Sequence, residues 1–511
     1  MKHAAFNNAL SIESTSRVKY SSYLFLFITG TLSPLGFAPF HMPGLTIISL
    51  AILYWTLSIS SFKQCLGLGF AFGFGYFSVG ISWVIVSIHD YGQMNYILSG
   101  LVTILFISYL ALFPAIVACF FKLLLSTQSK LVNLLLFSTL WCFCEFARAN
   151  LFSGFPWLLI GTTQIDTPVK YLAPILGVYG LSFWTCFTAA LLTHCVQEGA
   201  KKRYRYMMFF ALMITGPVVM KNIDWTTVKN EPITLGVIQA NLSMRDKWDE
   251  TLFWSMLKYY KEATESLLGK QLIILPESAI PLPASYLDDY LTSLHNKALM
   301  TNSAIILGIL QPTDNNETHY HNSVISLGKA NGQHVKQHLV PFGEYIPKPF
   351  VGINHWLNLP EPNIVPGKKS QDLIQVGEHP IASLICYEIA YPHLLRMQMP
   401  LAQWIVSISD NGWFGRSLAS YQQLQMAQFL SLMTGRFQIV VNNDGLSSVI
   451  NNKGDILDGL PPFSSGILQS EIFPASGSTP WIQTSDYPSL IFCSIFLVII
   501  LFLRLPRFSK Q

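Results

Sequence analysis

The strongest constraint on the fold is a series of long apolar segments. They are Tyr20–Phe40, Pro43–Ser61, Cys65–Ile88, Tyr96–Phe121, Leu131–Phe146, Tyr171–His194, Tyr206–Met220 and Tyr487–Leu503. Most approach the roughly 20 residues that a helix needs to cross a bilayer, although the fifth and the seventh are short. Only 12% of the 511 residues are charged and 51% are hydrophobic. We therefore expect about eight transmembrane helices: seven in a membrane domain of residues 1–220 and one in residues 487–511.

The basic residues beside these segments predict the orientation. They are Lys2, Arg17, Lys19, Lys63, Lys122, Lys130, Lys201, Lys202, Arg203, Arg205, Arg504, Arg507 and Lys510. With eight spans all of them fall on one side, which the positive-inside rule assigns to the cytoplasm. Both termini are then cytoplasmic, and residues 221–486 form an exported domain, periplasmic in a bacterial inner membrane. The net charge of +4, without a basic patch interleaved with aromatics, gives no indication of nucleic-acid binding.

The exported part alternates short strand-like runs with helical patterns. The predicted strands are Ile233–Ile238, Leu272–Leu275, Ala304–Ile309, Ser323–Leu327, Ile381–Ile385 and Trp404–Ile408, and the predicted helices are Glu250–Leu268, Tyr286–Leu299 and Tyr421–Thr434. Pro360–Lys369 and Pro461–Pro480, rich in Pro, Gly and Ser, are predicted loops. This pattern favours a layered α/β or α+β domain.

Cys386 is the one cysteine of the exported part, while the other seven lie in or beside apolar segments. It directly follows the strand-like run Ile381–Ile385, where an α/β fold can present a thiol to a cleft. A buried structural cysteine is the alternative, but an unpaired thiol in an oxidising compartment favours a function. Because no second thiolate lies near and the pair His319 and His321 is predicted in a loop, we expect no metal site.

Two further charged residues fit a cysteine nucleophile, which needs a base and a stabiliser of the oxyanion. Glu277 follows the apolar run Leu272–Leu275 after one proline, and a carboxylate at the end of a buried strand can act as a general base. Lys336 lies in an extended segment and can supply a fixed positive charge, and Glu344 follows in a turn rich in Pro and Gly. Each alone could be a solvated surface charge, but the order Glu, Lys, Cys is a more specific pattern.

Several motifs accompany that order: Leu275–Ser278 (LPES), His338–Tyr345 (HLVPFGEY), Ile385–Glu388 (ICYE), Trp413–Gly415 (WFG), Trp83–Gly92 (WVIVSIHDYG), Ser153–Leu158 (SGFPWL) and Leu176–Ser182 (LGVYGLS). The order resembles the catalytic triad of the carbon–nitrogen hydrolase (nitrilase) superfamily, and with these motifs the wider resemblance is to its integral-membrane branch, the apolipoprotein N-acyltransferases. The resemblance implies an α-β-β-α sandwich for the exported domain and spans nearly the whole chain.

The resemblance also implies a reaction. Cys386 would take an acyl chain from a phospholipid, such as phosphatidylethanolamine, and pass it to the α-amine of a diacylglyceryl-cysteine at a lipoprotein N-terminus. Glu277 would be the proton acceptor, and Lys336 with the backbone N–H of Tyr387 would hold the oxyanion. By their match to the family's motifs, Glu344 and Glu388 would be supporting carboxylates. Trp248 is a candidate aromatic residue for contact with the substrate. The resemblance implies no cofactor.

The chain departs from the family's pattern at several positions. Ala240–Ser243 stands where Gly-Asn-Ile-Pro is usual, and Asp410–Asn411 where Asn-Asp is usual. Gln423 replaces a common His, Met433 a common Glu and Val440 a common Arg. We expect none of these positions to touch the triad, so they bear on substrate preference rather than on the reaction class.

Two other functions fit parts of the sequence. The same triad could serve a membrane-tethered amidase in which water replaces the amine. A transporter or receptor whose exported domain only binds a ligand would carry paired charges within its spans. Glu145 and Arg148, at one span end, are the nearest such pair.

Overall fold

The chain divides into two compact units, one of residues 1–222 with 486–511 and one of residues 223–485. The computed structural model describes residues 20–508 except 93, 127–128, 314–317 and 353–361. Lys2, Arg17 and Lys19, on which part of the predicted orientation rests, lie outside the described residues. Each unit is described separately below.

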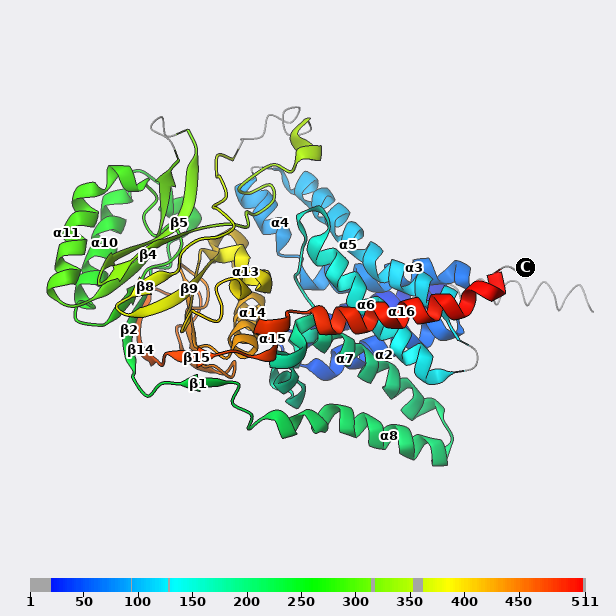
Figure 1. Ribbon diagram of the computed structural model, residues 1–511. Coiled ribbons are helices and arrows are strands. Elements are labelled where there is room, and N and C mark those ends of the chain that lie inside the picture. Colours follow the sequence, from blue (N-terminus) through cyan, green and yellow to red (C-terminus); the bar gives the residue numbers. More distant parts are fainter. Residues whose placement is uncertain (1–19, 93, 127–128, 314–317, 353–361, 509–511) are drawn as a thin grey trace, which may run out of the picture. The chain divides into compact units, whose positions relative to one another are not determined.

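The first unit is helical (Figure 1). A helix covers residues 20–32, followed by α2 (Pro43–Ile59), α3 (Phe62–Gly80), α4 (Val84–Val86), α5 (Tyr96–Leu124), α6 (Lys130–Asn150), α7 (Ala173–Gln197), α8 (Ala200–Thr215) and α16 (Tyr487–Phe508). Among the described residues, four helical segments are long and apolar enough to cross a membrane, and a bent pair makes a fifth. The first unit is therefore rich in membrane-type helices, although these criteria give fewer spans than the eight predicted.

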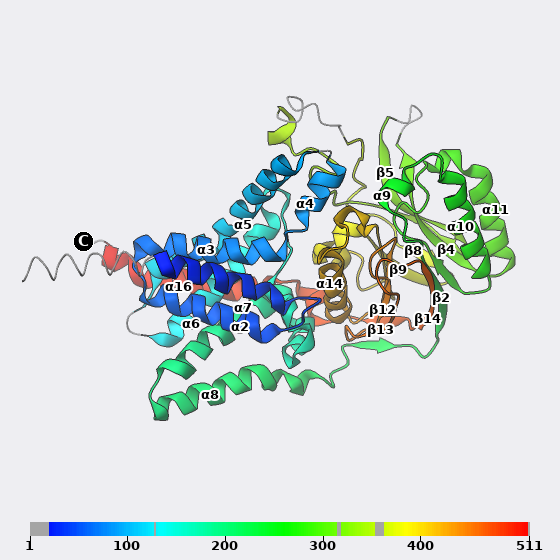
Figure 2. The ribbon, with the colours of Figure 1, turned by 180° about the vertical axis from the view of Figure 1, so that it is seen from behind.

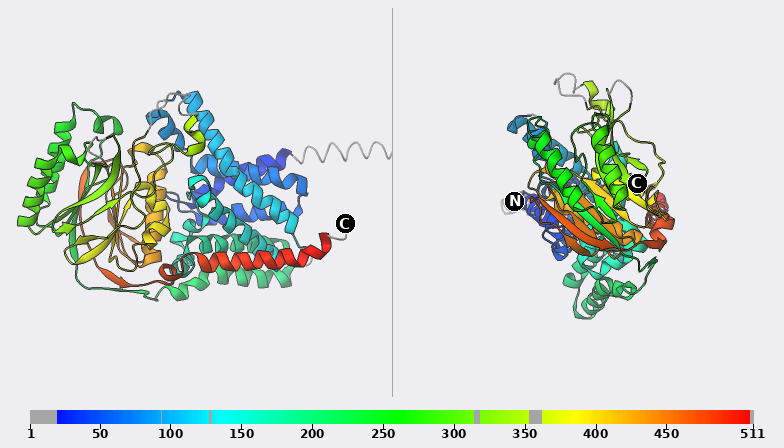
Figure 3. Two further views of the ribbon diagram at one scale, coloured as in Figure 1. Left: turned by 45° about the horizontal axis from the view of Figure 1, so that its top comes forward. Right: turned by 90° about the vertical axis from the view of Figure 1, so that its left-hand side faces the viewer.

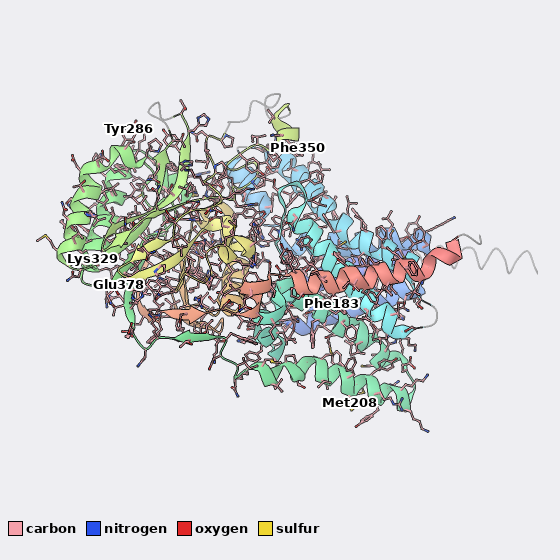
Figure 4. All side chains as sticks on the ribbon, in the orientation of Figure 1. Phe183, Met208, Tyr286, Lys329, Phe350 and Glu378 are labelled. Atoms are coloured by element: carbon pink, nitrogen blue, oxygen red, sulfur yellow. The ribbon has the colours of Figure 1, made fainter. Side chains whose placement is uncertain are left out.

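Two of the predicted spans differ from the helices that form. The run Cys65–Ile88 is not one helix, because α3 ends at Gly80 and the following helical segment, Val84–Tyr91, is bent from it by 64°. In place of the run Tyr206–Met220 the structure has α8, which begins at Ala200 and includes the basic residues between the sixth and seventh predicted spans, namely Lys201, Lys202, Arg203 and Arg205. Side chains such as Met208 on α8 project outward and are mostly exposed (Figure 4).

Small residues let the helices of this unit approach closely. A β-carbon on Gly69 of α3 would lie 2.6 Å from the carbonyl oxygen of Pro114 in α5, and one on Gly73 would lie 3.0 Å from the α-carbon of Ala111. Such spacing of glycines brings two backbones together and gains van der Waals contact where lipid removes any hydrophobic driving force. By contrast, α16 leaves Val498 and Phe502 largely exposed, as expected for a surface that faces lipid.

Glu145 and Arg148 are buried at the end of α6 and serve main-chain groups. Arg148 donates to the carbonyl oxygens of Phe155 at 2.7 Å and Trp157 at 2.6 Å. Glu145 accepts from the backbone N–H of Ile160 at 2.8 Å. Three polar backbone groups of the irregular segment after α6 are thus satisfied by side chains of one helix, as a low-dielectric surrounding requires.

The second unit is built on two large sheets, seen from behind in Figure 2. The six-stranded sheet has the order β14 (Gly466–Ile472), β2 (Ile233–Gln239), β3 (Leu272–Ile274), β4 (Ala304–Pro312), β5 (Tyr320–Gly328) and β7 (Gln333–Val335). The seven-stranded sheet has the order β13 (Ile456–Gly459), β12 (Ser448–Ile450), β11 (Gln438–Asn442), β10 (Ile405–Ser409), β9 (His379–Ile385), β8 (Ile374–Val376) and β6 (Ala330–Asn331).

The two sheets pack face to face because their side chains alternate between two apolar cores. In β3, Leu272 and Ile274 join the core shared with Ile385 and Val406 of the other sheet. Ile273 between them joins a second core beneath the outer helices. The result is the four-layer α-β-β-α arrangement that the resemblance implied.

Helices cover both outer faces of this sandwich. The second core holds Tyr260 of α10 (Phe253–Ser266) and Ala298 of α11 (Asp288–Met300). On the seven-stranded sheet, α14 (Ala419–Thr434) packs against β11 and β12, and α13 (Pro392–Arg396) packs against β9. Figure 3 shows the green helices and the gold helix on opposite sides of the strands.

The predicted strands and helices all form, with ends shifted by a few residues. The predicted loop Pro461–Pro480 was wrong in part, since β14 and β15 (Ala475–Gly477) lie inside it. The apolar residues of β14 are separated by Gln469 and Glu471, and strands at the edge of a sheet tolerate such polar positions. His321, expected in a loop, lies in β5.

The ends of this unit are joined by a small ribbon. Strand β1 (Thr226–Val228) pairs antiparallel with β15, with Thr226 opposite Gly477. Arg436 is fully buried nearby and donates to the carbonyl oxygens of Ala402 at 2.7 Å and Gly477 at 2.8 Å. The place where the chain enters the unit is therefore fixed beside the place where it leaves.

Candidate active site

The three candidate catalytic residues each follow the end of a strand. Glu277 comes three residues after β3, Lys336 directly after β7 and Cys386 directly after β9. Strands β3 and β7 belong to the six-stranded sheet and β9 to the seven-stranded sheet. All three side chains are buried, with 6%, 1% and 8% of the residue surface exposed. The sandwich therefore gathers the three groups from both of its sheets.

Left-handed backbone conformations lie at Cys386, beside Glu277 and in the turn that carries Glu344. Cys386 itself has φ of +52°, Ser278 beside Glu277 has +44° and Phe342 beside the Glu344 turn has +64°. This region costs an L-residue roughly 1–2 kcal/mol. Such strain persists where the surrounding contacts impose it, and it is concentrated at functional sites. At Cys386 the turn ends strand β9 abruptly and begins the short 3₁₀ helix Cys386–Ala390.

The Glu277 carboxylate is held at both of its oxygens. Oε1 accepts from Asn322 Nδ2 at 2.7 Å and from Lys336 Nζ at 3.3 Å. Oε2 accepts from the backbone N–H of Asp410 at 2.9 Å. A carboxylate fixed by three donors from three different segments has a defined orientation, which general base catalysis requires.

Lys336 lies between two carboxylates. Its Nζ donates to Glu344 Oε1 at 2.9 Å as well as to Glu277. Burial alone would lower the pKa of Lys336, but Glu277 and Glu344 outweigh it and hold the pKa well above its ordinary value. The ammonium group is thus a permanent positive charge in a site with little water. Glu344 Oε2 in turn accepts from the backbone N–H of Val340 at 2.8 Å, which fixes the turn.

The Cys386 thiol is protonated in the resting protein. Burial first, and then the Glu277 carboxylate, raise its pKa well above the ordinary value, whereas Lys336 and a hydrogen bond with Ser409 lower it. Since the thiolate is the nucleophile, a base must take the proton as the reaction begins. Gln423 donates to the Cys386 carbonyl oxygen at 3.2 Å and so supports the turn.

Glu388 ties the cysteine segment to the lysine segment. Its Oε2 accepts from the backbone N–H of Ile385 at 2.8 Å, and its Oε1 accepts from those of Gln337 at 2.6 Å and His338 at 3.2 Å. Burial would raise the pKa of Glu388, but the hydrogen bond and charge of His334 and these backbone donors lower it. The carboxylate is therefore ionised and joins the residues before Cys386 to those after Lys336.

Tyr387 and Trp248 have different surroundings. Tyr387 is buried directly after Cys386, and its hydroxyl accepts from that of Tyr391 at 3.1 Å. Trp248 follows the short helix α9 (Met244–Lys247) and is 49% exposed. The backbone N–H of Tyr387 thus belongs to the same turn as the thiol, while Trp248 has a surface free for contact with a substrate.

Two departures from the family's pattern do touch the triad, contrary to expectation. Asp410 contacts Glu277 through its backbone N–H, and Gln423 contacts the Cys386 carbonyl. Among the other departures, Ala240, Met433 and Val440 are buried apolar residues. Position 410 follows strand β10, which lies beside β9, so adjacency of the two strand ends was the signal that could have placed it.

Sequence reasoning also missed two polar residues. Asn322 in β5 bonds both Glu277 and Glu344 through Nδ2, at 2.7 and 3.2 Å. Lys247 is 1% exposed and forms an ion pair with Asp410. Asn322 directly precedes the predicted strand Ser323–Leu327, in a stretch without a distinguishing pattern. Lys247, directly before Trp248, resembles an ordinary surface charge until the fold buries it.

Comparison with known proteins agrees with this arrangement. Residues 29–191 match the family described as apolipoprotein N-acyltransferase N-terminal domain, and residues 234–479 match the carbon-nitrogen hydrolase family. The apolipoprotein N-acyltransferase of Pseudomonas syringae pv. tomato is 33% identical, with 94% of this chain and 96% of that protein covered. The chain belongs to the apolipoprotein N-acyltransferase family.

A second member of this family, the apolipoprotein N-acyltransferase of Coxiella burnetii, is 34% identical over 92% of this chain and 98% of that protein. Among solved structures, a carbon-nitrogen hydrolase from Helicobacter pylori G27 is 16% identical, covers 47% of this chain and 89% of its own, and has a TM-score of 0.36. The matches to other apolipoprotein N-acyltransferases thus include the helical unit as well as the sandwich.

Proposed function

We propose that this chain transfers a fatty acyl chain from a phospholipid to the N-terminal amine of a lipoprotein through a thioester on Cys386. The observation that carries the proposal is the buried group of Glu277, Lys336 and Cys386 in a chain that matches apolipoprotein N-acyltransferases along more than 90% of its length. The donor we propose is phosphatidylethanolamine, and the acceptor is the α-amine of an S-diacylglyceryl-cysteine.

The first half-reaction acylates the enzyme. Glu277 takes the proton of the Cys386 thiol, and the thiolate attacks the ester carbonyl of the donor. The Lys336 ammonium and the backbone N–H of Tyr387 stabilise the oxyanion that forms. The tetrahedral intermediate collapses with cleavage of the ester C–O bond. Glu277 returns the proton to the departing lysophospholipid alcohol, and Cys386 retains the acyl chain as a thioester.

The second half-reaction transfers the acyl chain. The acceptor amine attacks the thioester carbonyl, and Lys336 and the Tyr387 N–H hold the second oxyanion. Glu277 removes a proton from the attacking nitrogen. Cleavage of the C–S bond releases the amide, and the proton passes back to the Cys386 sulfur. Such a sequence has ping-pong kinetics.

Topology is part of the proposal. We propose eight spans, with residues 1–220 and 487–511 in the inner membrane, both termini cytoplasmic, and residues 221–486 as the periplasmic catalytic domain. The basic residues near Lys122 and Arg504 support this orientation. An impermeant thiol reagent added outside spheroplasts should then label Cys386 and none of the seven other cysteines. Labelling of Cys386 only after lysis would reverse the orientation.

The decisive experiment supplies phosphatidylethanolamine and a diacylated lipopeptide to the purified protein and follows both products by mass spectrometry. We expect the lipopeptide to gain one acyl chain and an acyl adduct to be trapped on Cys386 when the lipopeptide is omitted. Glu277→Gln should form no adduct while folding normally. Release of free fatty acid without a mass gain on the lipopeptide would favour the amidase-like hydrolysis instead.

A further inference from the structure

Lys247 and Asp410 form a buried ion pair that has no part in the proposed mechanism. Only 1% of the Lys247 side chain and 3% of the Asp410 side chain are exposed. They come from separate parts of the sandwich, Lys247 from α9 and Asp410 from the residue after β10. Burying two charges costs several kcal/mol per ion before their attraction offsets it. A pair retained at that cost indicates a specific task.

The pair contacts Glu277 at two points. Lys247 Nζ donates to the main-chain carbonyl oxygen of Glu277 at 3.1 Å. The backbone N–H of Asp410 donates to Glu277 Oε2 at 2.9 Å. One member of the pair therefore fixes the backbone of Glu277, and the other fixes the end of its side chain.

Asp410 is itself held rigidly. Its Oδ1 accepts from the backbone N–H of Gly412 at 3.2 Å and from Asn443 Nδ2 at 3.1 Å, while Oδ2 faces Lys247. Asn443 also bonds the backbone of Leu242 in both directions, at 2.7 and 3.1 Å, shortly before α9. Both members of the pair are thus anchored to the same framework, so a shift of either one would be transmitted to Glu277.

We propose that Lys247 and Asp410 are a positioning pair that holds the carboxylate of Glu277 at the angle required to take the thiol proton. The inference rests on the proposed function, because it presumes that Glu277 is the base. Neither residue touches a reacting atom. They act on the rates of the proton transfers that Glu277 carries out, beginning with the one at Cys386, where a misplacement of about 1 Å can cost about 100-fold in rate.

The test measures single-turnover formation of the Cys386 thioester from phosphatidylethanolamine in detergent micelles. Lys247→Met and Asp410→Ala should each lower the rate at saturating phospholipid by about 100-fold and leave the half-saturating concentration nearly unchanged. Lys297→Met is the matched control, since Lys297 forms an ion pair with Glu265 at 2.5 Å on the surface of the outer helices. That variant should acylate at the wild-type rate.

The double variant Lys247→Met/Asp410→Ala separates positioning from stability. Removing both charges should restore much of the thermal stability that either single change costs, because no charge is left buried alone. The hydrogen bond to the Glu277 carbonyl is still missing, so the acylation rate should stay low. Recovery of the rate together with the stability would overturn the inference, and so would single variants that acylate normally.

Glu277→Gln, measured alongside, distinguishes a failure of the positioning inference from a failure of the base assignment. If Glu277→Gln forms no thioester and the pair variants form it at the wild-type rate, only the positioning inference fails. If Glu277→Gln itself acylates normally, the base assignment fails, and the inference fails with it.

Discussion

Asp444 offers a quantitative test of the electrostatics beside the site. It follows β11, is 9% exposed, and its Oδ1 has no hydrogen-bond partner among the described residues. Burial first, and then the charge of Asp410, raise the pKa of Asp444 from 3.8 to about 7, while Lys247 lowers it. The folded protein therefore keeps this carboxyl protonated at pH values where the unfolded chain has released the proton.

The sign of the effect follows from proton linkage. Between about pH 4 and pH 7 the unfolded state binds fewer protons at this residue than the folded state, so the free energy of unfolding falls as pH rises. The contribution is fully present below pH 4 and is lost by the time pH passes 7. A shift of about 3 pKa units at 1.36 kcal/mol each gives about 4 kcal/mol as an upper limit.

The perturbation is Asp444→Asn, which keeps the shape and stays neutral at every pH. We expect the variant to match the wild type near pH 3 and to exceed it by up to about 4 kcal/mol at pH 8. Hydrogen exchange of peptides covering β11 and β12, compared between the two proteins at each pH, reports the local free energy of opening. Asp458→Asn, on the exposed strand β13, is the control. A difference that does not change with pH would refute the reasoning.

Four further variants test other parts of the site and its frame. Cys386→Ser should lower the rate of acyl transfer by roughly 10³-fold or more, because a hydroxyl is a much weaker nucleophile than a thiolate. Turnover at the wild-type rate would contradict the requirement for a thiol. Gly308→Ala should lower stability by about 1–3 kcal/mol and should also slow acylation, because a β-carbon there would lie 2.6 Å from the Glu277 α-carbon. Thermal unfolding and an acylation rate equal to those of the wild type would argue against this contact. Glu388→Gln should lower the free energy of unfolding by about 2–3 kcal/mol, because the charge-assisted hydrogen bonds of Glu388 are weakened. The variant should also react more slowly with iodoacetamide at Cys386. Equal alkylation rates in the variant and the wild type would show that Glu388 does not hold the turn. Arg436→Met should destabilise the second unit by about 3 kcal/mol or more, because it leaves buried carbonyl oxygens without donors. The unfolding midpoint should fall while KM stays unchanged. A rise in KM without a change in the midpoint would instead indicate a role at the substrate.

The sequence predicted the elements that have strong local patterns. The strands Ile381–Ile385 and Leu272–Leu275 are apolar runs that tertiary packing reinforces on both faces, and they form as β9 and β3. The three candidate catalytic residues could be proposed because Glu277 and Cys386 follow such runs and Lys336 lies just before the motif His338–Tyr345. Strands with weaker patterns escaped, as β14 did inside a stretch rich in Pro and Ser.

Contacts between distant segments could not be predicted in the same way. The burial of Lys247 depends on Asp410, which lies 163 residues away in the chain. Asn322 reaches two carboxylates only because β5 and β7 pair with Ser323 opposite Val335. Polar residues of this kind carry no local signal, since their meaning comes from the register of the sheets.

The ribbon of β1 and β15 bears on how such a chain could arise. Because Thr226 pairs with Gly477, the 263 residues from Ile223 to Ser485 begin and end at one place. A domain with adjacent ends can be inserted between two helices of an existing membrane protein without pulling them apart. The helical unit then needs no new core to accept it, and the catalytic sandwich keeps its own. In this view the membrane part and the enzyme part could have changed independently of each other.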